Sequence, residues 1–100
     1  MGPSADCHRV LARICVRNPG DYYLSEADRQ TGIRTLTIQL PNTPGLVTIS
    51  IIAGPTRKEL VWGWDGDEER PSLIPSIRSD AGKAGYWHGV LRQRRLVAYE

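Results

Sequence analysis

The sequence predicts a mostly β domain, a compact antiparallel roll or small sandwich of about six or seven short strands with little helix. Short runs of alternating or β-branched apolar residues recur along the chain. Clusters of Pro, Gly, Asn and Asp separate these runs and are typical of turns. With 100 residues the chain fits one domain, so the strands are expected to share a single core.

The composition sets the limits of that domain. Hydrophobic residues make up 40% of the chain and there is no Phe, which allows a real but small core. We expect residues 1–8 to form a flexible N-terminus and residues 9–100 to form the β-rich domain. There is no apolar run of about 18 residues to span a membrane. The start of the chain lacks the layout of a secretion signal, and Cys7 and Cys15 suggest no disulfide framework, so a reduced cytoplasmic protein is expected.

The strands are expected in order along the chain. At residues 9–17 apolar side chains recur with a period of two, which favours a half-buried strand, although a short helix also fits. Residues 22–31 are ambiguous, because Ser25 can cap one helical turn that Gly32 would end. The remaining strands are expected at 33–40, 46–52 and 59–64, around Ser76, around His88, and at 96–99.

A predicted hairpin brings two reactive side chains together. Residues 79–85 are polar, contain two glycines and connect two apolar segments. A hairpin symmetric about Gly82 pairs Ile77 with Trp87 and Ser76 with His88. Residues opposite each other in an antiparallel pair point to the same face, so the hydroxyl and the imidazole would meet there while Ile77 and Trp87 enter the core.

A serine beside a histidine is the nucleophile–base pair of serine hydrolases, in which the imidazole takes the hydroxyl proton. The alternative is a cross-strand hydrogen bond without catalysis. A third group should orient His88, and Asp65 and Asp67, after the tryptophan strand, are the candidates, with Asp80 and Glu100 as further ones. Asp–Gly turns use an Asp for local hydrogen bonds in any case. An oxyanion hole would come from backbone N–H groups near Ser76 or Gly89, since Pro75 has none.

Aromatic and small residues beside this pair are candidates for binding a substrate. Trp64, Trp87 and Gly89 are the predicted contacts, while the alternative for both tryptophans is a place in the core or at its rim. Pro71 and Pro75 indicate that their strand lies at a sheet edge, where an extended peptide can add as a further strand. The alternative is that the prolines protect the edge from aggregation.

Three segments together resemble a known family. They are Trp62-Gly63-Trp64-Asp65-Gly66-Asp67, Arg70-Pro71-Ser72-Leu73-Ile74-Pro75-Ser76-Ile77 and Trp87-His88-Gly89. This pattern resembles the BubE-like family found in phages and in operons for bacterial ubiquitination-like pathways, whose members are regarded as serine peptidases. The resemblance covers roughly a third of the chain, from Trp62 to about Leu96, and marks Ser76 as the nucleophile and His88 as the base.

The resemblance implies that the substrate is the C-terminal tail of a ubiquitin-like protein, in a pathway connected with antiphage defence. Many relatives have a cysteine-rich segment before the tryptophan turn, but residues 36–51 hold no cysteine, so neither a metal nor another cofactor is predicted. The alternative function is a non-catalytic phage or bacterial binding module that inhibits a host factor. The net charge of +2 is too small to imply a nucleic-acid partner. The arginines at 92–95 could bind nucleic acid, but a solvated β-turn is the preferred interpretation, and no membrane partner is expected.

Overall fold

The computed structural model describes residues 4–41, 43, 45–54, 61–74, 76–80 and 86–99, with the backbone alone at 79, 80 and 86. Within these ranges the chain is mostly β, as predicted, with one short 3₁₀ turn. The elements are β1 (Ala5–Asp6), β2 (His8–Arg9), η1 (Arg13–Cys15), β3 (Asp21–Leu24), β4 (Arg34–Ile38), β5 (Val47–Ala53), β6 (Val61–Trp64), β7 (Leu73–Ile74), β8 (Ile77–Asp80), β9 (Tyr86–Arg92) and β10 (Arg95–Ala98). Among the described residues, no helix has the length and apolar character needed to cross a membrane.

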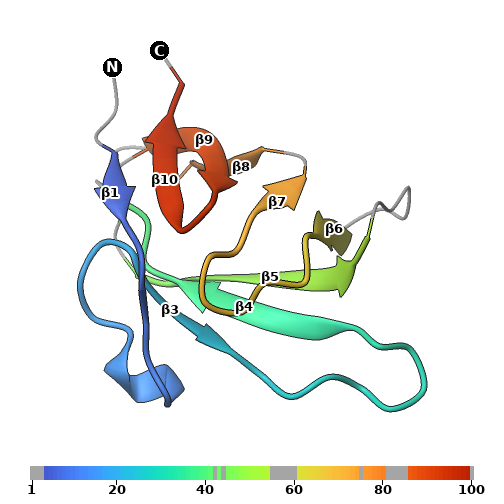
Figure 1. Ribbon diagram of the computed structural model, residues 1–100. Coiled ribbons are helices and arrows are strands. Elements are labelled where there is room, and N and C mark those ends of the chain that lie inside the picture. Colours follow the sequence, from blue (N-terminus) through green and yellow to red (C-terminus); the bar gives the residue numbers. More distant parts are fainter. Residues whose placement is uncertain are drawn as a thin grey trace.

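The strands form two sheets that curl around one core (Figure 1). One sheet has four strands in the order β1-β10-β9-β8, and the other has six in the order β2-β3-β4-β5-β6-β7. All pairs are antiparallel except β2 with β3 and β5 with β6. The fold is therefore a closed variant of the predicted antiparallel roll.

Two stretches of chain pass from one sheet to the other and close the fold. β1 and β2 are separated by Cys7 alone, yet β1 ends the four-stranded sheet and β2 ends the six-stranded sheet. β7 and β8 are separated by residues 75–76 and form the other two edges. Figure 1 shows β1 beside β10 and β7 beside β6, so each corner begins in one sheet and continues into the other.

The core lies between the inner faces of the two sheets. The predicted alternation at 33–40 is confirmed, because Leu36, Ile38 and Leu40 are fully buried. The core also receives aromatic and aliphatic side chains from both sheets, among them Tyr22, Ile51, Trp64, Leu73, Ile77, Trp87, Leu91 and Leu96. Burial of this apolar surface is the main favourable term in folding.

A polar cluster lies where β3, β4 and the loop after β6 meet. Arg34 donates to Glu68 at 2.8 Å, and its guanidinium lies 5.3 Å from the ring centre of Trp64. The hydrogen bond from Arg34 holds the pKa of the Glu68 carboxyl below its usual range. The Tyr22 hydroxyl donates to the Glu68 carbonyl at 2.6 Å, and burial raises the pKa of Tyr22 to about 12. These contacts fix the loop that carries Asp65 and Asp67 against the sheet.

The prediction of a strand over residues 9–17 is wrong beyond Arg9. The chain turns through η1, and the side chains of Leu11 and Ile14 are 89% and 76% exposed. The returning Asp21 carboxylate accepts the N–H groups of Arg17 and Asn18 at 3.2 and 2.9 Å, and so closes a loop in place of a strand. Val16 is buried but Ile14 is not, so the period of two in this segment does not mark the buried face of a strand.

The domain also begins earlier than predicted. Residues 5–8 were expected to lie outside it, but β1 pairs with β10, and His8 in β2 pairs with Asp21. Cys7 between them is fully buried, and its N–H donates to the Arg94 carbonyl at 2.8 Å. Burial raises the pKa of the Cys7 thiol to about 12. The N-terminal strand is thus part of the closure.

The turn between β9 and β10, predicted at residues 92–95, is confirmed and has an unusual backbone. Gln93 and Arg94 have φ of 46° and 65°, the left-handed values that two-residue hairpin turns require and that Asn–Gly supplies most easily. The segment before β7 holds this turn in place. The Gln93 N–H donates to Ser72 Oγ at 2.7 Å, and the Arg94 N–H donates to the Pro71 carbonyl at 3.1 Å.

We predict that replacing Gln93 and Arg94 together by Asn and Gly raises the free energy of unfolding by about 1 kcal/mol, because the left-handed conformation then costs less. Urea denaturation measures the change. Arg95→Gly is the matched control and should lower stability, because Arg95 lies in a strand. A less stable double variant would show that the native side chains stabilise this turn.

Candidate active site

Ser76 and His88 meet at the junction between the two sheets. Ser76 immediately precedes β8 and His88 lies in the middle of β9. Ser76 Oγ is 3.0 Å from His88 Nε2, within hydrogen-bond distance, and both residues are partly exposed. This separation is the one that a nucleophile and its base require.

The predicted register of this hairpin is wrong by two residues. Ile77 pairs with Gly89 instead of Trp87, and His88 pairs with Arg78. A shift of two leaves every side chain on its predicted face, so the hydroxyl and the imidazole still share a face, as diagonal neighbours. The observed register suits the core, because Gly89 opposite Ile77 leaves room for the large ring of Trp87. The predicted centre of the connection, Gly82, lies outside the described residues.

Neighbouring side chains hold each member of the pair. Trp62 in β6 donates its indole N–H to the Ser76 carbonyl at 3.1 Å and so links the six-stranded sheet to the residue before β8. Tyr99 donates its backbone N–H to the His88 carbonyl at 2.8 Å. The rings of Tyr99 and His88 pack edge to face with their centres 4.9 Å apart. The imidazole is therefore oriented by an aromatic side chain.

Asp65 and Asp67 do not lie beside His88. Asp65 Oδ1 accepts the N–H groups of Asp67 and Ser72, and Asp67 Oδ1 accepts those of Glu69 and Arg70. Ser72 in turn contacts Gln93, which is roughly 15 Å along the chain from His88. Both carboxylates are local turn acceptors. Among the described residues no carboxylate is hydrogen-bonded to His88 Nδ1, and Glu100 and the Asp80 side chain lie outside the description.

Trp87 and Gly89 serve the core rather than a substrate. Trp87 is 1% exposed. A Cβ added at Gly89 would lie 2.3 Å from the Val97 carbonyl oxygen and 2.6 Å from the Trp87 ring. Gly89 also pairs with both β8 and β10, so its N–H group belongs to the sheet, and an oxyanion hole is better sought near Ser76.

Trp64 is buried too, but it borders an open hollow. Its indole N–H donates to the Asp67 carbonyl at 3.3 Å. The hollow has a volume of about 220 Å³ and is lined by Gly54, Gly63, Trp64, Asp65, Ser72 and Ile74. Gly63 is the cross-strand partner of Ile74 and has no side chain to fill this space. The hollow lies on the β7 side of Ser76.

A second depression lies on the β8 side of Ser76. This groove has a volume of about 340 Å³ and is lined by Val47, Thr48, Ile49, Ser50, Trp62, Ile77 and Arg78. It runs between the first half of β5 and the start of β8. Both β7 and β8 end their sheets, which confirms the predicted edge position of this strand. A hydrogen-bonded serine thus stands between two recesses on an edge.

Neither cysteine contributes to the site. Cys7 is buried in the N-terminal strand and Cys15 is exposed in η1. Within the described ranges, no group of three or more His, Cys, Asp or Glu side chains is placed to hold a metal ion. The side chains that sequence reasoning missed are Trp62, Tyr99 and Arg78. The period of two along residues 76–78 places Arg78 on the same face as Ser76 and could have predicted its position at the site. Trp62 and Tyr99 reach the site through tertiary packing, which a local pattern does not predict.

We predict that Gly89→Ala lowers the free energy of unfolding by about 2–3 kcal/mol, because the new methyl group meets backbone and a buried ring. Gly66→Ala is the control. Gly66 has open space around it and φ of 83°, so its replacement should cost about 1 kcal/mol through conformation alone. Thermal and urea denaturation compare the two variants. A loss at Gly89 no larger than that at Gly66 would show that the strand and the Trp87 ring accommodate the methyl group.

The roles of the residues at this site follow from the geometry of the chain. It provides a serine, a histidine at hydrogen-bond distance and two flanking recesses on an edge. Comparison with protein-family models, curated proteins and solved structures finds no match to this chain.

Proposed function

We propose that this protein is a serine peptidase that cleaves a peptide bond in the extended C-terminal tail of a ubiquitin-like protein. The observation that carries the proposal is the 3.0 Å contact between Ser76 Oγ and His88 Nε2 at a sheet edge. The choice of a ubiquitin-like tail follows the sequence resemblance. An extended tail fits this site because an edge strand offers unpaired backbone groups to a peptide.

The reaction needs a particular proton arrangement. His88 Nε2 can accept the Ser76 proton when the imidazole carries its own proton on Nδ1. Ser76 Oγ then bonds to the scissile carbonyl carbon while its proton passes to Nε2. The C–N bond breaks, and the leaving amine takes that proton. Water next gives a proton to Nε2 and its oxygen to the acyl carbon, and Ser76 regains its proton as the acid product leaves.

The pair works here without a carboxylate among the described residues. A third member in serine hydrolases fixes the orientation and tautomer of the histidine. In this protein the Tyr99 ring and its backbone N–H fix the orientation of His88.

We predict that Ser76→Ala abolishes labelling by a fluorophosphonate probe and cleavage of a precursor ubiquitin-like protein. His88→Gln should lower the cleavage rate by about 10²–10⁴-fold, because the general base is lost. Gel fluorescence and mass spectrometry of the products measure these effects. Ser25→Ala is the control and should retain both activities, since Ser25 lies in the loop after β3. Labelling that persists in Ser76→Ala would refute the assignment, and tail binding without cleavage would support the binding module instead.

Tyr99 should act as a positioning residue. We predict that Tyr99→Ala lowers kcat by about tenfold to hundredfold with little change in KM, because the imidazole loses its edge-to-face support. Tyr99→Phe keeps the ring and should stay near the wild-type value. Steady-state kinetics on the same substrate decide between them. Equal losses in both variants would assign the effect to the phenol hydroxyl rather than to ring packing.

A further inference from the structure

We propose that Ile74, Ser76 and Arg78 form a substrate-reading row. In this row an apolar side chain of the peptide binds beside Ile74, and an acidic group of the peptide binds at Arg78. This inference rests on the proposed role of Ser76 and adds the chemistry of the substrate on either side of the cleaved bond. The row is defined by alternate positions in the sequence from the end of β7 to the start of β8.

Burial alternates along this strand in the way such a row requires. Leu73 and Ile77 are each 1% exposed and point into the core. Ile74 is 72% exposed, Ser76 is partly exposed and Arg78 is exposed. These three residues therefore lie on the solvent side of the segment, whereas Leu73 and Ile77 lie on its core side. A peptide lying along the strand would meet all three.

The Ile74 end of the row offers an apolar recess. Ile74 and Trp64 line the hollow of about 220 Å³, and Gly63 forms part of its wall without a side chain. That volume suits one aliphatic side chain such as leucine. Contact between the exposed Ile74 and such a side chain would stabilise the complex, because apolar surface of both partners is removed from water.

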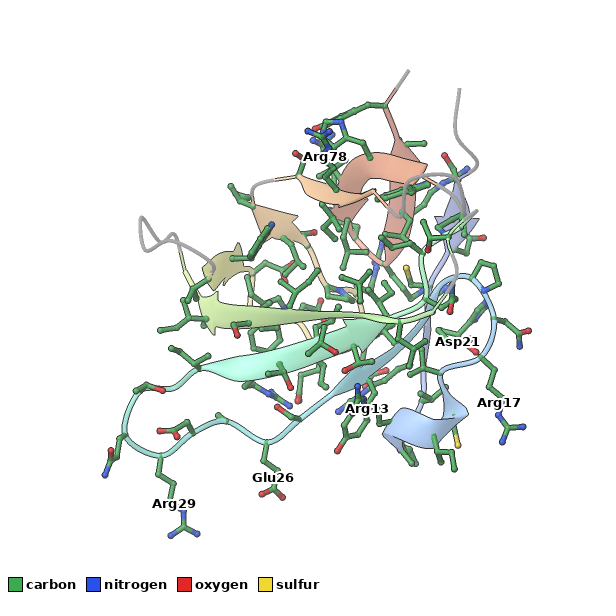
Figure 2. The ribbon with its side chains drawn as sticks, turned by 180° about the vertical axis from the view of Figure 1, so that it is seen from behind. Arg13, Arg17, Asp21, Glu26, Arg29 and Arg78 are labelled. Carbon is green, nitrogen blue, oxygen red and sulfur yellow. The ribbon has the colours of Figure 1, made fainter. Side chains whose placement is uncertain are left out.

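The Arg78 end of the row offers charge. Arg78 lines the groove of about 340 Å³ and is the cross-strand partner of His88. A guanidinium has five N–H donors, so it can bind a carboxylate while keeping contacts within the protein. Figure 2 shows Arg78 at one end of the molecule, whereas the labelled Arg13, Arg17 and Arg29 lie at the opposite end. Arg78 therefore lies apart from these three arginines.

The spacing fixes the register of the substrate. Ile74 and Arg78 are four residues apart, with Ser76 midway in the sequence, so they are at most about 14 Å apart. An extended peptide spans that distance in up to four residues, so its apolar and acidic residues should be up to four positions apart with the cleaved bond between them. The preferred occupant is an extended peptide, because β7 and β8 both end their sheets.

The test uses full-length Ser76→Ala protein, so that binding is measured without cleavage. Fluorescein-labelled heptapeptides of Gly, Ala and Ser carry one leucine and one aspartate four positions apart, in both possible orders. Matched peptides replace aspartate by lysine or leucine by serine. Fluorescence anisotropy at low salt gives the affinities. We expect one order to bind about tenfold more tightly with aspartate than with lysine, as a charge-assisted contact predicts.

Further variants in the same background assign this preference to residues. Arg78→Glu should reverse the preference for aspartate, Arg78→Lys should keep it, and Ile74→Ser should remove the preference for leucine. Arg29→Glu makes the same change of charge at the far end of the molecule and should change nothing.

The substrate-reading row is refuted if no peptide binds, if aspartate and lysine peptides bind equally, or if Arg29→Glu has the same effect as Arg78→Glu. Failure of the proposed peptidase would appear elsewhere, as absent probe labelling of the wild-type protein. The two results are therefore distinguishable.

Discussion

The fold depends on two short segments of the chain that each pass from one sheet to the other. A sheet of four short strands and a sheet of six would each leave two edges open, and open edges attract other chains. Here the N-terminal strand leaves β10 to join β3, and the strand from β7 to β8 leaves β6 to join β9. The chain thereby links the edges of the two sheets at two corners, and the apolar faces pack on one core. Without these two transfers the chain would expose the interior that Leu36, Trp87 and their neighbours fill.

The candidate site occupies one of these corners, and this location explains its properties. A strand that changes sheets must bend, and the bend after β7 carries the Ser76 backbone to the Trp62 indole. Ser76 thus receives support from the six-stranded sheet while its hydroxyl contacts His88 in the four-stranded sheet. Trp62 also lines the groove, together with Ile77 and Arg78 of β8. Closure of the fold and construction of the site are consequences of the same turn in the backbone.

The sequence predicted what depends on local periodicity and missed what depends on packing. Alternation placed Ser76 and His88 on one face correctly even though the register was two residues off, because a shift of two conserves the face. It failed at 9–17, where apolar residues alternate in a loop that has no sheet to bury them. Asp65 and Asp67 looked available to a histidine, yet their turn uses both carboxylates. The roles of Tyr99 and Cys7 arise from contacts between segments far apart in the chain, which no short pattern reveals.

The buried thiol of Cys7, at the other corner, can report whether the N-terminal strand is in place. Cys7 lies where β1 gives way to β2, and its thiol is protected both by burial and by a pKa of about 12. Because the thiolate is the form of cysteine that reacts with alkylating reagents, Cys7 becomes reactive when the N-terminal strand detaches. Cys15, eight residues later and exposed, provides an internal reference for the reagent. The ratio of alkylation at Cys7 to alkylation at Cys15 thus measures how often the N-terminal strand detaches under native conditions.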